Sequence, residues 1–198
     1  MDKIFTEDNV WFGGFYELAI EIGKSPNENL HSSLIEIWND PLLDGCYLDR
    51  NREPYEQDKI NPLNIKIENV LHLQGLIRLP NNKWTACGTC IIMEDEGSDW
   101  LDFYIPLGAL SKYYDTDGYP FNEKNNKNLT WQSTIDDLLS TIGNNLFSKV
   151  NYKLGLIGFE VSGEYYSENI KSSGIPEKRE IGFLSPTNSQ IKYYPKNI

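Results

Sequence analysis

Two cysteines stand three positions apart, at Cys87 and Cys90, with Gly-Thr between them. This spacing is typical of zinc knuckles and redox pairs when it lies in a turn or at a helix start. A structural zinc needs four ligands, and the remaining candidates are Cys46, His72 and His31. Cys46 and His72 would complete the site, because His72 lies on a neighbouring predicted strand. The surrounding residues instead predict a strand, which points Cys87 and Cys90 to opposite faces unless Gly88 forms a bulge. We therefore expect buried, reduced cysteines and no cofactor, with the zinc site and a redox pair as alternatives.

Carboxylates within predicted strands are the second candidate chemistry. Glu160 lies in the most apolar segment of the chain, and Asp102 lies between two large apolar residues. A buried carboxyl has a raised pKa, and such groups serve general acid–base catalysis. Together with His72 they suggest a catalytic or ligand-binding cleft between sheet and helix. Glu17 and Glu21 repeat the pattern, although the open polar face of an antiparallel sheet would produce it as well.

The familiar catalytic motifs are missing from the sequence. It contains two histidines, no G-x-S-x-G, no G-x-G-x-x-G and no P-loop. An enzyme or small-ligand domain built on strand carboxylates is therefore the alternative function, and the leading hypothesis is a protein without enzymatic activity.

The charge of the chain points to a partner. Its 198 residues include 18 Lys and Arg against 29 Asp and Glu, a net charge of −11. Such a surface repels phosphate backbones and anionic membranes, so we expect neither nucleic acid nor membrane binding. It favours a basic protein. The predicted partner-binding residues are two groups of acids with two aromatic anchors: Glu94, Asp95, Glu96, Asp99 and Asp102; Asp40, Asp44 and Asp49; and Trp100 and Tyr47.

In size, charge and structural class the chain resembles the small acidic immunity proteins with which bacteria neutralise toxins, many of them basic nucleases. No motif carries this resemblance, so it assigns no residue a role. What it implies is an inhibitor that occludes a basic toxin by steric and electrostatic contact, with association that depends on salt.

The pattern of apolar residues predicts how these groups are positioned. Alternation over residues 16–22, hairpin signals over 65–105 and a final pair at 181–194 predict six to eight strands. Apolar stripes predict two amphipathic helices. The first is capped by Ser25, begins at Pro26 and is closed by Pro41, and the second is capped by Thr130 and extends to Val150. We expect one α+β domain spanning 1–198, a mainly antiparallel sheet of meander hairpins with both helices on one face. The expected polar loops are 50–64, 111–129 and 162–180. The first eight residues have no signal-peptide pattern, so a cytoplasmic location is expected.

Overall fold

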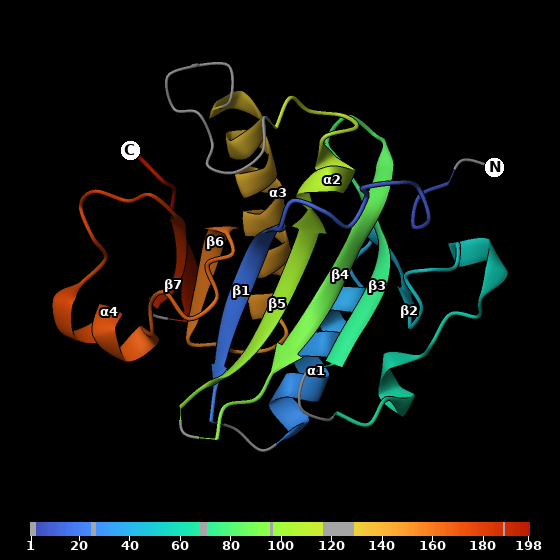
Figure 1. The fold of residues 1–198 in the computed structure, drawn as a ribbon. Coiled ribbons are helices and arrows are strands. Elements are labelled where there is room, and N and C mark those ends of the chain that lie inside the picture. The colour runs from blue at the N-terminus through green and yellow to red at the C-terminus, as the bar shows by residue number, and fades with distance from the viewer. Residues whose placement is uncertain (1–2, 25–26, 68–70, 96, 117–128, 188) are drawn as a thin grey trace.

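A computed structural model describes residues 3–24, 27–67, 71–95, 97–116, 129–187 and 189–198. In these ranges eight strands form one sheet, in the order β2-β3-β4-β5-β1-β6-β7-β8 (Figure 1). The strands are β1 (Phe15–Gly23), β2 (Leu43–Tyr47), β3 (Leu71–Arg78), β4 (Trp84–Ile92), β5 (Asp99–Pro106), β6 (Leu154–Phe159), β7 (Gly182–Thr187) and β8 (Gln190–Tyr194). The helices are α1 (Asn27–Trp38), α2 (Leu107–Leu110), α3 (Leu129–Phe147) and α4 (Ser167–Ser173).

The predicted α+β class is confirmed, and every neighbouring strand pair is antiparallel. Strands β3, β4 and β5 form the expected meander. The chain's first strand does not extend that meander at an edge. It is inserted between β5 and β6, so β1 is hydrogen-bonded on both sides and is buried along most of its length.

One face of the sheet carries the main core and the two long helices. Figure 1 shows α1 and α3 behind the sheet. Leu18 and Ile20 of β1 are in the same buried cluster as Leu34 of α1 and Ile142 of α3. These residues form the apolar side of an alternating strand and the apolar stripes of two helices. The periodicity of the sequence therefore predicts that they pack together.

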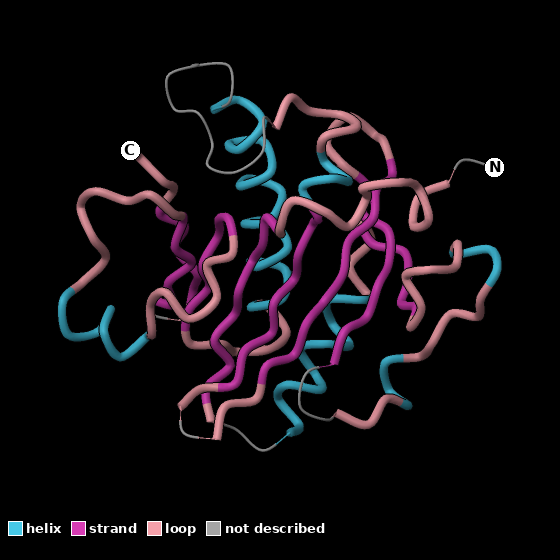
Figure 2. The backbone as a smooth tube through the Cα atoms, in the orientation of Figure 1, coloured by secondary structure: helices cyan, strands magenta, loops and turns pink. Residues whose placement is uncertain are grey.

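The opposite face carries a smaller core beneath α4. Ala19 and Trp100 lie there with Ile170 of α4. The prediction of a plain loop over 162–180 is therefore wrong, because seven residues of it form this helix. A helix this short has too few turns to reveal a stripe in the sequence. The backbone trace in Figure 2 shows α4 at the side of the sheet away from α1.

The polar segment 50–64 is also more ordered than a plain loop. It contains two 3-10 turns, Pro54–Glu56 and Pro62–Asn64. The carboxylate of Glu53 accepts hydrogen bonds from the backbone amides of Ile4, Phe5 and Thr6, and from the Thr6 hydroxyl. Burial raises the pKa of Glu53, but these bonds outweigh it, so the pKa is lowered overall. No helix in the described ranges has the length and hydropathy of a membrane span.

Candidate functional site

The cysteine pair does not form a zinc site. Strand β4 pairs with β3 and β5 without a register shift, so Gly88 makes no bulge and the predicted alternation is confirmed. Cys87 packs in the core beneath the helices, as does Cys46, whereas Cys90 lies on the opposite face with its Sγ 3.6 Å from His72 Nε2. Burial raises the pKa of the Cys90 thiol to about 12, and nearby Asp102 and Glu17 add to the rise. Within the described ranges, no three His, Cys, Asp or Glu side chains are grouped to hold a metal.

Glu17 and Asp102 form a buried pair on that opposite face. They come from adjacent strands, since Ala19 pairs with Asp102 across β1 and β5. The backbone amide of Ser162 donates to Glu17 Oε1 at 3.0 Å. Asp102 Oδ1 is buried and has no hydrogen-bond partner among the described residues. Burial raises the pKa of both carboxyl groups, and the charge of Asp102 raises that of Glu17 further.

Glu21 lies on the same face and is fully supplied with donors. Ser98 Oγ donates to Glu21 Oε1 at 2.7 Å. The Ser167 amide at the start of α4 donates to Oε2 at 2.6 Å, and the Ser167 hydroxyl donates to Oε1 at 3.0 Å. Because Glu17 and Glu21 are both buried, the alternative of a solvated sheet face is wrong for them.

The alternative catalytic set does not converge as the sequence predicts. His72 and Asp102 do share the face opposite α1 and α3, but Cys90 of the intervening strand stands between them in the register. Glu160 lies beyond the end of β6, where it is exposed in the left-handed backbone region at φ 47°. The pKa of His72 is lowered by burial and by the charge of Arg50. Because the apolar residues continue to Val161, the sequence does not show that β6 ends at Phe159, one residue before Glu160.

Half of the predicted partner-binding residues are buried. Trp100 is 1% exposed and Tyr47 is 3% exposed, so neither is available as an anchor. Asp99 and Asp102 are buried in β5. Asp40 is buried after α1, where it accepts hydrogen bonds from the Leu42 amide and the Asn145 side chain. Acids that are close together in the sequence are thus not all exposed on the surface, because strand pairing and capping hydrogen bonds bury several of them.

The remaining predicted acids lie in two separate places. Glu94 and Asp95 are at the β4–β5 turn, Glu94 accepting a hydrogen bond from the Tyr166 hydroxyl and Asp95 being exposed. Asp44 is on the edge strand β2 and forms an ion pair with Lys59. Asp49, just after β2, accepts from the Asn51 amide. Glu96 lies outside the described residues.

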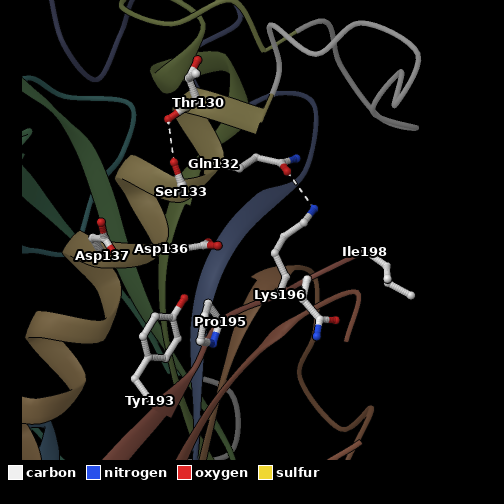
Figure 3. A pocket seen from close by; sticks show the side chains of 10 residues that line it. Thr130, Gln132, Ser133, Asp136, Asp137, Tyr193, Pro195, Lys196 and Ile198 are labelled. Carbon is white, nitrogen blue, oxygen red and sulfur yellow. Dashed lines mark hydrogen bonds between the residues drawn. The ribbon is translucent and has the colours of Figure 1, made fainter. Parts of the chain in front are cut away.

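A pocket of about 510 Å³ lies between α3 and the segment that follows β8 (Figure 3). Its wall is formed by side chains from residues 130–137 on one side and 193–198 on the other. The pocket combines two carboxylates (Asp136 and Asp137), an ammonium group, an aromatic ring and several apolar carbons. This volume and mixture are typical of small-molecule sites.

Asp136 is the buried acid of this pocket. It is 3% exposed, and its Oδ1 accepts a hydrogen bond from the Tyr16 hydroxyl at 2.6 Å. Burial raises the pKa of Asp136 to about 6, against the lowering effects of Tyr16 and Lys196. The side chain therefore remains mostly ionised at neutral pH, although it is almost out of contact with water.

The wall opposite α3 supplies a cation and a buried hydroxyl. Lys196 Nζ donates to Gln132 Oε1 at 2.8 Å. Tyr193 points its hydroxyl toward Asp136 in Figure 3, and this oxygen has no hydrogen-bond partner among the described residues. Burial, and then the negative charge of Asp136, raise the pKa of Tyr193. The pocket thus holds both charges, and also a polar atom that still lacks a partner.

Sequence reasoning did not identify this site. Gln132 and Asp136 are four positions apart at the border of the α3 stripe, and that spacing puts them on one side of the helix. This is a signal, but it is also typical of any solvated helix flank. What makes the site is the crossing of residues 193–198 over that flank, which no local pattern contains. Comparison of the chain with protein-family models, curated proteins and solved structures found no match.

Proposed function

We propose that this chain binds a small organic molecule in the pocket between α3 and residues 193–198. The observation that carries the proposal is the buried carboxylate of Asp136 bordering a cavity of about 510 Å³. Burying an ionised carboxyl costs free energy unless it is well paired, and here the tyrosine hydroxyl is the one hydrogen bond seen on it among the described residues. Buried charges with displaced pKa values beside a cavity are typical of functional sites.

The pocket favours binding rather than covalent catalysis. No histidine or cysteine is among the described residues that line it. The Ser133 hydroxyl donates to the Thr130 carbonyl oxygen at 3.1 Å, so its hydrogen is not directed to a base that could activate it as a nucleophile. Asp136 is then a recognition group whose charge orients a ligand.

Filling the pocket tests this function. A library of small fragments is screened by thermal shift against the wild-type chain and against Ser133→Phe, whose ring enters the cavity. Thr141→Phe is the matched control, since Thr141 is also an exposed hydroxyl residue of α3 but does not line the pocket. We expect hits that stabilise the wild type and the control and not Ser133→Phe. Equal stabilisation of all three would refute the pocket as the site.

A basic protein partner is the second candidate. The observation favouring it is that the exposed β4–β5 turn lies against the start of α4, through the Tyr166–Glu94 hydrogen bond. The exposed acids Glu164 and Glu168 flank Tyr166 and extend the negative charge of Glu94 and Asp95. This candidate predicts that Glu94→Lys with Asp95→Lys slows association with a captured basic protein at low salt. An unchanged on-rate would contradict it.

A further inference from the structure

The two charges of the pocket are not paired with each other. Lys196 Nζ is bonded to the neutral amide of Gln132, and no ion pair joins it to Asp136 in the described part of the chain. In Figure 3 the Asp136 carboxylate and the Lys196 ammonium come from opposite walls of the cavity. The lining thus includes two carboxylates, exposed Asp137 and buried Asp136, and one ammonium group. Asp136 and Lys196 face each other across the cavity, and each has hydrogen-bonding capacity to spare.

This arrangement selects against ligands with a single charge. A simple amine would pair with Asp136 but would meet the like charge of Lys196. A simple carboxylate would pair with Lys196 but would meet Asp136. Only a molecule with both charges satisfies both walls, and repulsion of the other two classes is itself a source of specificity.

The rest of the lining is suited to an apolar side chain. The Tyr193 ring, Pro195 and Ile198 lie beside the charged groups and offer carbon surface. The buried Tyr193 hydroxyl offers a further hydrogen bond to whichever ligand group settles near Asp136.

We infer that the ligand is a zwitterion of the α-amino acid type, with its ammonium group on Asp136, its carboxylate on Lys196 and its side chain against Tyr193 and Pro195. This inference rests on the proposed function, because it names the ligand class of the same pocket.

The probes are the twenty common α-amino acids, titrated singly by calorimetry. The best binder is then compared with the amine and with the carboxylic acid that share its side chain. We expect the amino acid to bind and each single-charge analogue to bind about thirtyfold or more weakly.

Two variants assign the charges. Asp136→Asn and Lys196→Gln should each weaken amino-acid binding by about thirtyfold or more. Asp58→Asn removes the same charge from an exposed residue that does not line the pocket, and should change the affinity by less than about threefold. Because Asp136 is buried, circular dichroism first establishes that Asp136→Asn folds. If that variant does not fold, the test rests on Lys196→Gln, which changes a half-buried residue.

The outcomes separate this inference from the function on which it rests. An amine that binds as tightly as the amino acid, or an affinity unchanged in Lys196→Gln, overturns the zwitterion. Fragment hits that map to the pocket while all twenty amino acids fail also overturn it, but leave the pocket as a ligand site. Failure of both fragments and amino acids overturns the two together.

Discussion

Buried acids have different surroundings on the two faces of strand β1. On the helix face, Tyr16 donates its hydroxyl hydrogen to Asp136, and this carboxyl borders a pocket. On the other face, Glu17 lies with Asp102 beneath the Ser162 amide, and Glu21 is fully hydrogen-bonded to Ser98 and Ser167. Tyr16 and Glu17 are adjacent in the chain. The helix face, where Tyr16 lies, borders a cavity, whereas the face of Glu17 is covered by α4 and the segment before it.

This difference shows that a displaced pKa does not identify a site by itself. Burial raises the pKa of Asp136, Glu17 and Asp102 alike. What separates Asp136 is that a cation and an apolar wall face it across a cavity large enough for a ligand. Glu21 instead has the environment of a structural acid that anchors a helix.

The largest effect is expected from Glu21, because three donors depend on it. Glu21→Ala should lower the free energy of unfolding by about 3 kcal/mol, since it leaves the Ser167 amide and two hydroxyls buried without an acceptor. Urea unfolding gives the value, and exposed Glu168 on α4, changed to Ala, is the control. A loss below about 1 kcal/mol would mean that α4 is not anchored by this carboxylate.

The second prediction concerns pH. The pKa values of Glu17 and Asp102 are raised in the folded chain, so the unfolded chain binds fewer protons above pH of about 4. Their stabilising contribution is complete below that pH and is lost as the pH rises through neutrality. The double variant Glu17→Gln with Asp102→Asn should reduce this loss of stability. Chemical unfolding between pH 4.5 and 8.5 measures the free energy of unfolding against pH. Equal slopes in the wild type and the double variant would show that the carboxyl pair is not the cause.

The pH dependence of Glu53 has the opposite sign. Its pKa is lowered in the folded chain, so its contribution is present above the ordinary carboxyl pKa and is lost as the pH falls. Glu53→Gln should therefore remove part of the acid-induced destabilisation without changing the slope above neutrality. Amide exchange of residues 4–6 at pH 3 and pH 6 distinguishes this local contribution from that of the carboxyl pair.

A smaller effect is expected from the helix-face pair. Tyr16→Phe removes the one hydrogen bond seen on Asp136 in the described residues and should cost about 1 kcal/mol at neutral pH. It should also raise the pKa of Asp136 further, because that bond favours the charged form. Carboxyl carbon NMR titration measures the pKa. Tyr152→Phe, which removes a bond to the Gly143 carbonyl, is the matched comparison and should leave it unchanged.

The smallest effect is a difference in thiol reactivity between the faces. Cys87 is completely enclosed beneath the helices, whereas Cys90 retains slight exposure beside His72. In the native chain Cys90 should react slowly with a maleimide and Cys87 should not react, because burial raises the pKa of both thiols. Mass spectrometry of the labelled peptide decides it, and faster reaction of Cys87 would contradict the strand register.

Much of the fold follows from local patterns. Alternation in β1 places Leu18 and Ile20 on one face and Glu17 and Glu21 on the other, and the sheet has that arrangement. The stripe of α3 likewise gives its buried side. The insertion of β1 between β5 and β6 is a choice among long-range pairings that no window of sequence contains.

The site was less accessible to prediction because burial is a tertiary property. The acids around Trp100 in the sequence predict a surface position for it, yet β5 is paired on both sides and covered on both faces. Asp136 has no distinguishing signal in the sequence, because two consecutive acids on a helix are typical of a solvated flank. Only the position of Tyr193 and Lys196, some 60 residues later in the chain, turns that flank into a pocket.

The central claim is that a small molecule binds beside Asp136. The most direct test is a titration of the 15N-labelled chain with the amino acids and the fragment hits, followed by two-dimensional NMR. We predict that amide shifts concentrate in residues 130–137 and 193–198, and that Asp136→Asn shifts the amino-acid response to concentrations about thirtyfold higher or more. Shifts confined to the β4–β5 turn and α4, or no shifts at millimolar ligand, would contradict the account.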